Sequence, residues 1–199
     1  MKARTVNGKI DSVTRLVCLE GISPIMFDRY AGDNNTKLLW TQKLYLKPGT
    51  NHVTIPAINI MSFLSSHNTN SAPKRLRDKR KYKDIANSCL SFTVISPDFI
   101  PILRDGEPVE FHDPGGDDVD EVSGIYLHRS VARLDKGIPN PKERPVLPLP
   151  WSLEFQLTLL ANSEIKEQEI RNLFEEGGLA IGLGTFRGVF GKFVISQWE

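Results

Sequence analysis

Residues 151–193 carry the sequence pattern that indicates most about the fold. It opens with WSLEFQLTLL (151–160), where apolar and polar residues alternate as in a β-strand with one buried face. Residues 163–178 have helical spacing of their apolar positions, with Ser163 as the expected N-cap and Gly177-Gly178 as the expected stop. The chain then reads GLGTFRGVFGKF (182–193) and ends in a run typical of a strand. This order of strand, helix, glycine-rich loop and strand predicts an α+β fold.

The earlier part of the chain continues the same mixture of elements. Strands are expected at 6–19, 38–46, 89–95 and 122–134, a helix at 57–67, and a hairpin at 104–111 that turns at Asp105-Gly106. Residues 135–150 carry five prolines, so we expect an extended segment that cannot form a central strand. Two helices among strands in this order fit one domain (1–199) of ferredoxin type: an antiparallel sheet with helices on one face and inserted loops.

The composition is that of an ordinary globular chain. Of its 199 residues, 40% are hydrophobic and 25% charged, with a formal net charge of +1. No window approaches the roughly 18 consecutive apolar residues of a membrane-spanning helix, and the first residues lack the apolar run of a signal peptide. Cys18 and Cys89 lie in apolar runs and are expected to be buried thiols. These features predict a cytoplasmic protein with no membrane partner.

Charge is segregated along the chain, although the total is nearly neutral. The basic run, residues 74–83, has seven cations and one carboxylate, Asp78. The acidic run, residues 105–121, has eight carboxylates and no Lys or Arg. Opposite blocks of this kind favour self-association or a polyanionic partner on one face. We expect them in two insertions, a basic one near 68–84 and an acidic one near 105–121.

Both ends of the chain carry patterns that resemble known proteins. ARTVNGKI (3–10), PWSLEF (150–155) and the glycine-rich loop (182–193) together resemble a group of small phage and prophage proteins. Phe186 stands where tryptophan is usual in that group, and Gly188 replaces a proline. The strand, helix and glycine-rich loop are also similar to the signature of the RAMP superfamily, the ferredoxin-like RNA-binding subunits of CRISPR effector complexes.

The resemblance implies several properties. The fold would be RRM-like, and the activity would be binding to a nucleic-acid backbone rather than catalysis. Subunits of this kind assemble head to tail along RNA, which implies self-association into a filament or ring. A phage-encoded protein would work in the cytoplasm of the bacterial host. The resemblance covers the two ends of the chain and leaves the role of segment 20–120 unassigned.

Three groups of residues are candidate nucleic-acid contacts. The glycine-rich loop could bind phosphates through the backbone N–H groups of 182–188 and the Arg187 guanidinium, or it could be a tight connection with Phe186 and Phe190 in the core. The basic run could be an arm that neutralises phosphates, with Tyr82 available for stacking, or a solvated helix face. The full candidate set is Lys74, Arg75, Arg77, Lys79, Arg80, Lys81, Lys83, Arg129, Arg133, Gly182, Gly184, Arg187 and Gly188.

The third group lies in the expected strand at 122–134. Arg129 and Arg133 are expected on one face of that strand. With Lys136, Lys142 and Arg144 they could form a second basic strip. The alternative is an edge strand that is protected from aggregation by its charges.

Motifs for catalysis are sparse. The four histidines and two cysteines show no zinc-binding spacing, and no phosphate-binding glycine motif follows a strand, so neither a metal nor a cofactor is expected. The acidic cluster at 113–120 lacks calcium-loop spacing and is expected to be a solvated loop. Some RAMP proteins cut RNA with a histidine or an aspartate outside the loop. By that resemblance, His67 and Asp33 are the candidate catalytic residues.

The sequence thus favours a non-enzymatic protein that binds single-stranded RNA or DNA along the phosphate backbone. Two alternatives remain open. One is a phage protein-interaction module, such as an inhibitor of a host defence complex or a docking factor on it. The other is an RNA-cleaving nuclease. No base-reading or ribose-reading pattern separates RNA from DNA, and no feature sets an oligomer number.

Overall fold

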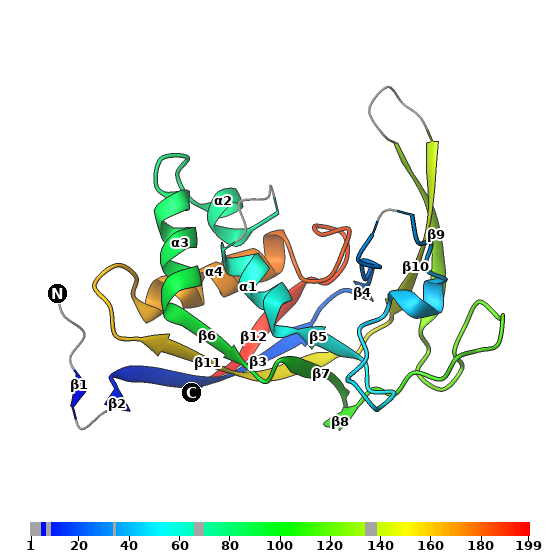
Figure 1. Cartoon of the computed structure of the whole chain (residues 1–199), viewed down its shortest axis with the longest axis horizontal. Coiled ribbons are helices and arrows are strands. Elements are labelled where there is room, and N and C mark those ends of the chain that lie inside the picture. Colours follow the sequence, from blue (N-terminus) through cyan, green and yellow to red (C-terminus); the bar gives the residue numbers. More distant parts are fainter. Residues whose placement is uncertain (1–4, 7–8, 34, 66–69, 134–138) are drawn as a thin grey trace.

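The computed structural model describes residues 5–6, 9–33, 35–65, 70–133 and 139–199. Its strands are β1 (Thr5–Val6), β2 (Lys9–Ile10), β3 (Ser12–Gly21), β4 (Ile25–Met26), β5 (Thr54–Pro56), β6 (Thr93–Ser96), β7 (Phe99–Arg104), β8 (Glu107–Pro108), β9 (Tyr126–Arg133), β10 (Pro139–Leu147), β11 (Ser152–Leu160) and β12 (Phe193–Trp198). Its helices are the 3-10 helix η1 (Trp40–Lys43) and the α-helices α1 (Ala57–Ser65), α2 (Ala72–Leu76), α3 (Tyr82–Phe92) and α4 (Glu167–Ala180). The predicted mixture of helices and antiparallel strands is confirmed (Figure 1).

The main sheet is centred on β11, whose alternating sequence buries Leu153, Phe155 and Leu157. β3 pairs with β11 on one side, with Val17 opposite Phe155, and β12 continues the sheet beyond β3. On the other side, β6 and β7 pair with successive parts of β11, and β5 pairs with β7. The resulting strand order is β12-β3-β11, then β6 and β7, then β5, and these neighbours are antiparallel.

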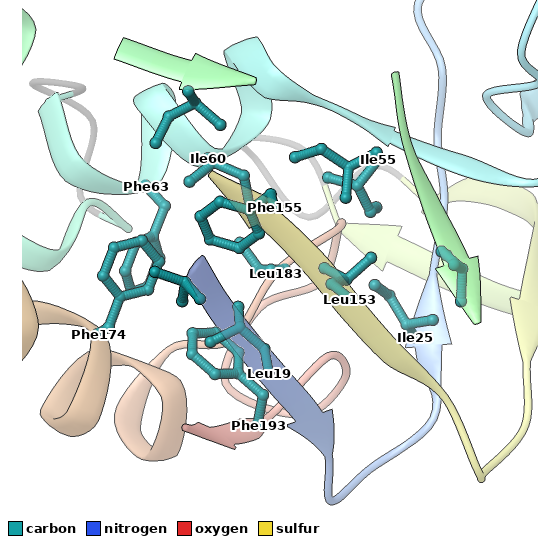
Figure 2. Close-up of a cluster of buried hydrophobic side chains, with 14 of the residues drawn as sticks. Leu19, Ile25, Ile55, Ile60, Phe63, Leu153, Phe155, Phe174, Leu183 and Phe193 are labelled. Atoms are coloured by element: carbon teal, nitrogen blue, oxygen red, sulfur yellow. The ribbon is translucent and has the colours of Figure 1, made fainter. Parts of the chain in front are cut away.

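The helices lie together on one side of this sheet, and a group of phenylalanine rings fills the layer between them (Figures 1 and 2). Phe174 of α4 is at the centre of the group. Its ring centroid is 5.5 Å from that of Phe63, 6.1 Å from that of Phe155 and 6.3 Å from that of Phe193. All four side chains are buried, and large aromatic side chains contribute strongly to a core of this kind. This core anchors both ends of the glycine-rich loop, which joins α4 to β12.

Gly177 and Gly178 lie inside α4, so the prediction that they stop the helix is wrong. A Cβ at Gly177 would lie 2.5 Å from the ring of Phe63, and a Cβ at Gly178 would lie 2.5 Å from the carbonyl oxygen of Phe193. The two glycines therefore allow α4 to pack closely against α1 and β12. The helix also begins later than predicted, with Lys166 as N-cap in place of Ser163.

Two predicted strands differ from the structure. Residues 38–46 contain the short 3-10 helix η1 in place of the strand, and both Trp40 and Leu44, the residue that follows η1, are buried. The segment from Cys89 to Phe92 belongs to α3, and β6 begins only at Thr93. Cys89 is buried in that helix.

The turn of the hairpin predicted at 104–111 is confirmed. β7 and β8 pair across Asp105 and Gly106, which have φ angles of 53° and 85°. Two successive positive φ angles are the mark of the tight turn that Asp-Gly favours. The predicted helix at 57–67 is confirmed as α1 over Ala57–Ser65.

A second sheet has the order β4-β10-β9. Its strands β9 and β10 form the hairpin that projects at the upper right of Figure 1. Its central strand is the proline segment, contrary to the prediction. Pro139, Pro141 and Pro145 occupy alternate positions, so their missing N–H groups all face one side of the strand. The carbonyl oxygen of Pro145 accepts the N–H of Phe27 at 3.0 Å, on the side of β4. The side that pairs with β9 therefore keeps its hydrogen-bonding groups.

Candidate nucleic-acid interface

The basic run extends through the end of α2, a turn and the start of α3. Five of its cations are exposed and form no ion pair or side-chain hydrogen bond with other described residues; we call them the basic turn: Arg75, Lys79, Arg80, Lys81 and Lys83. Asp78, the one carboxylate in the run, accepts the N–H of Arg80 at 2.7 Å and so stabilises the turn itself. The basic turn thus presents uncompensated positive charge to solvent.

Arg77 has a structural role, although it belongs to the same run. Its Nε donates to Glu169 at 2.6 Å, and its two terminal nitrogens donate to Glu176 at 2.9 and 3.0 Å. The hydrogen bonds to Glu176 and Glu169 raise the pKa of Arg77, whose side chain is 17% exposed. Arg77 therefore joins α2 to α4. Lys74 is half-buried and has an interaction within the protein.

The hairpin of β9 and β10 separates its cations by face. Arg129 donates to Asp118 at 2.6 and 2.9 Å and to Glu143 at 3.3 Å, so its charge is matched by two carboxylates. Arg133 lies in β9, but its side chain is outside the part of the chain that is described. On the other face, His128 pairs with Arg144 and Ser130 with Lys142 across the ladder. The basic strip of the hairpin is therefore strongest on the face of His128.

The glycine-rich loop folds back on itself and on β4. Its backbone N–H groups are largely used inside the protein: Gly182 donates to Gly177, Leu183 to Gly191, Thr185 to Met26, Gly188 to Ile181 and Gly191 to Pro24. The N–H groups of Gly182 and Gly188 are therefore not available to a phosphate, which corrects that part of the expectation. Binding through Gly184 stays a prediction.

Close backbone contacts explain three of these glycines. Gly182 has a φ of +83°, and a Cβ there would lie 2.6 Å from the backbone of Gly191. Gly184 has a φ of +77°, and a Cβ there would overlap the carbonyl oxygen of Met26. Gly191 has a φ of +71°, and a Cβ there would overlap the carbonyl oxygen of Leu183. Gly188 has a φ of +90° but faces open space. The structural interpretation of the loop is thus favoured for the three that are tightly packed.

Arg187 is a half-buried cation without a carboxylate partner among the described residues. Its Nε donates to the carbonyl oxygen of Gly184 at 3.2 Å, and its Nη1 donates to that of Asn70 at 2.9 Å. Burial lowers the pKa of Arg187. Carbonyl oxygens satisfy N–H groups but do not neutralise a guanidinium, so this site retains an unmatched positive charge.

The two phenylalanines of the loop lie near the surface. Phe186 is 53% exposed, and Phe190 is half-buried. The expectation that both rings are in the core is wrong for Phe186. The reason is the backbone, because the internal hydrogen bonds of the loop direct this residue outward.

A hollow of about 770 Å³ lies between residues 28–39 and β10. Its lining includes four cations, Arg29, Lys37, Lys43 and Lys142. One of its carboxylates, Asp28, pairs with Arg144 at 2.7 Å and with Lys43 at 3.7 Å. Within the described chain, Lys37 and Lys142 form no ion pair. Sequence patterns do not single out Arg29, Lys37 and Lys43, because each stands alone in the chain and only folding groups them.

Asp33, a candidate catalytic residue, lines the same hollow. Its Oδ2 accepts the hydroxyl of Thr36, and its Oδ1 accepts the N–H groups of Thr36 and Asn35, all at 2.7 Å. The Thr36 hydroxyl, followed by the two backbone N–H groups, lowers the pKa of Asp33. This pattern is typical of a turn cap. His67, the other candidate, lies outside the described residues.

The acidic run is exposed, as predicted, at seven of its eight carboxylates, and Asp120 is the exception. Asp120 is 2% exposed and accepts the N–H groups of His112 and Val122 at 3.0 Å and the hydroxyl of Ser123 at 2.5 Å. Burial opposes ionisation, but these hydrogen bonds outweigh it and lower the pKa of Asp120. Three or more His, Cys, Asp or Glu side chains arranged to hold a metal ion are not found among the described residues.

The face of the main sheet opposite the helices is acidic on its two central strands. Cys18 and Glu20 of β3 and Glu154 of β11 lie on it, and Thr14 bonds to Thr158 across the two strands at 2.9 Å. Burial, with Glu154, Glu199 and Glu20, raises the pKa of Cys18. On β3 and β11 this face carries no cation and no aromatic ring. An RRM-like contact through stacked rings on the sheet has no support there.

In the described part of the chain, no helix is both long and apolar enough to span a membrane.

The comparisons with known proteins find a likeness among solved structures alone. No protein-family model matches the chain, and no curated protein matches it. Among solved structures, the chain is similar to a chain in the cryo-EM structure of the Type III-B Cmr-beta bound to cognate target RNA. The TM-score is 0.59 at 12% identity, over 94% of this chain and 60% of that one, so this chain spans less than two thirds of the matched length. At this identity the likeness concerns the fold.

Proposed function

We propose that this chain is a non-enzymatic protein that binds single-stranded RNA or DNA along the phosphate backbone. The observation that carries the proposal is the basic turn, whose five exposed cations lack carboxylate partners among the residues described. Neighbouring uncompensated cations repel one another, and a polyanion relieves that repulsion while its own counterions are released.

Arg187 supports the same proposal in a different way. Among the described residues, this half-buried guanidinium donates to carbonyl oxygens and has no carboxylate partner, so it has lost solvation without gaining a counter-charge there. A phosphate that reached it would supply that charge through charge-assisted hydrogen bonds. The hollow lined by Lys37 and Lys142 offers further unmatched cations.

The topology supports a ferredoxin-type, RAMP-like domain as the finer form of the fold. The order β12-β3-β11-β6 is the one expected when two strand–helix–strand units interleave their strands, with α1 to α3 in the first unit and α4 in the second. The similar Cmr-beta structure contains bound target RNA, which is in keeping with a nucleic-acid ligand here. Phage or prophage origin, part of the same proposal, rests on the terminal sequence patterns.

Head-to-tail assembly is a further part of the proposal. The exposed carboxylates of the acidic run include Asp117 and Glu121, which form no side-chain hydrogen bond or ion pair with the rest of the described chain. They could meet the basic turn of a second copy in a heterologous contact, which builds a ring or a filament.

The test is fluorescence-anisotropy binding of labelled single-stranded RNA, single-stranded DNA and duplex DNA across a salt series. Three proteins are compared: the wild type, Lys79→Ala/Lys81→Ala in the basic turn, and the control Lys47→Ala/Arg171→Ala, which removes the same charge elsewhere. We expect wild-type binding to weaken with salt and the basic-turn variant to bind more weakly, with a logarithmic salt slope lower by about two. The control is expected to stay close to wild type.

Other outcomes separate the alternatives. No binding to any strand at low salt would contradict the proposal and favour a protein-interaction module. Shortening of the RNA that Asp33→Ala abolishes would instead favour a nuclease. Equal losses in the two double variants would mean that net charge, and not the basic turn, determines affinity.

A further inference from the structure

Three aromatic rings form a row between the glycine-rich loop and β9. The ring centroids of Phe186 and Phe190 are 6.0 Å apart with their planes at 33°, and those of Phe190 and His128 are 5.6 Å apart at 67°. The N–H of Phe190 donates to the carbonyl oxygen of Phe186 at 3.3 Å. The row therefore joins two distant parts of the sequence and is held by backbone contacts as well as by the rings.

Phe186 has an unusual backbone conformation. Its φ is +52°, in the left-handed region that a bulky side chain rarely adopts. The side chain is 53% exposed, and that of Val189 in the same loop is 56% exposed. Core packing does not account for the strained backbone, since about half of the ring surface is left in water. Strain of this kind is concentrated at binding and catalytic sites.

The hairpin face beside the row is positively charged. His128 and Ser130 stand directly opposite Arg144 and Lys142, so all four side chains share one face of the ladder. Arg144 is paired with Asp28 at 2.7 Å. Lys142 has no ion pair with the described part of the chain. Lys142 thus lies two positions along β10 from Arg144, which stands opposite His128, and Phe186 lies at the other end of the row from His128.

We propose that the row is a stacking platform for one unpaired nucleobase, with the ring of Phe186 as the contact surface and Lys142 beside a flanking phosphate. This inference rests on the proposed function and extends it. The cations account for contacts with the phosphate backbone, whereas the ring of Phe186 would contact a base. Aromatic rings beside cations are the combination by which single-strand grooves hold bases without reading their sequence. The charge beside the ring favours this occupant over an apolar peptide.

The test uses a single strand that contains the fluorescent base 2-aminopurine and a strand of equal length built from abasic units. The proteins are the wild type, Phe186→Ala, Phe186→Trp and the control Val189→Ala, which removes apolar surface from the same loop without removing a ring. For Phe186→Ala we expect roughly 5- to 100-fold weaker binding of the base-containing strand and loss of 2-aminopurine quenching. Phe186→Trp is expected to retain both, and Val189→Ala to stay near wild type.

The abasic strand separates a binding effect from a folding effect. If Phe186 stacks on a base, Phe186→Ala binds the abasic strand as well as the wild type does. Equal losses on both strands would overturn the platform, and so would unchanged affinity and quenching with the base-containing strand. Either result leaves backbone binding standing if the wild type still binds in a salt-dependent manner. Failure of the wild type to bind any strand would overturn the proposed function and the platform together.

Discussion

Gly184 and Gly188 have the same left-handed backbone for different reasons. Both have a positive φ, which any residue with a Cβ adopts only at a cost. At Gly184 the carbonyl oxygen of Met26 also occupies the place of a Cβ, whereas at Gly188 that place is open. The pair therefore separates conformational strain from close packing within one loop.

We expect Gly188→Ala to lower the free energy of unfolding by about 1 kcal/mol, the cost of a left-handed conformation. Gly184→Ala should lower it by about 3 kcal/mol, because overpacking against backbone is added to that cost. Chemical denaturation measures both. Equal losses would show that the contact with Met26 relaxes freely.

Asp120 is expected to stabilise the segment around it through its ionised form. Because its folded pKa is lowered, its contribution is present above the unfolded value of about 4 and is lost as the pH falls through the folded pKa. At neutral pH, Asp120→Asn should therefore cost about 1–3 kcal/mol of unfolding free energy. The difference from wild type should shrink below about pH 4. Asp117→Asn, at an exposed position, is the control, and a pH-independent difference would contradict the assignment.

Among the elements, α2 is attached to α4 by its C-cap residue Arg77, while Arg75, inside α2, is exposed to solvent. We expect Arg77→Met to lower the unfolding free energy by about 1–2 kcal/mol, since it removes charge-assisted hydrogen bonds. Arg75→Met should change stability by less than about 0.5 kcal/mol.

Binding assays with the same two variants should give the opposite order. Arg75→Met is expected to weaken single-strand binding, whereas Arg77→Met is expected to bind nearly as well as wild type. Thermal denaturation and anisotropy titration on the same preparations measure the two effects. A larger binding loss in Arg77→Met would place the phosphate contact at that residue.

Strong periodicity makes some elements predictable from sequence. Other elements are not predictable, because their apolar spacing does not identify the type of element that forms. β11 and α1 are predictable because each has one uninterrupted apolar face. Residues 38–46 are not, because their apolar alternation is typical of a strand although the segment contains the short 3-10 helix η1. The candidate site is similar: the basic run is visible as a cluster, but the carboxylates that hold Arg77 lie far along the chain. The prolines of β10 suggest wrongly that the strand cannot pair. What matters is their position and not their number, because prolines at alternate residues remove N–H groups from one side of the strand and leave the other side able to pair.

At the scale of the whole molecule, opposite charges lie on separate segments. If head-to-tail assembly occurs, size-exclusion chromatography with light scattering should show oligomers at low salt that dissociate at high salt, because screening weakens contacts between exposed charges. Lys79→Glu/Lys81→Glu should abolish the oligomers. Mixing that variant with Asp117→Lys/Glu121→Lys should restore association between the two proteins. A monomer at every salt concentration, with or without a single strand, would contradict the assembly.

The position of β3 has a consequence for how the protein is made. β3 lies between β11 and β12, whose residues follow it by most of the length of the chain. Until those strands leave the ribosome, both edges of β3 remain unpaired, and unpaired edges invite pairing with other chains. Contacts this remote in sequence also form slowly. Synthesis therefore exposes an early strand whose two neighbours in the sheet are made last.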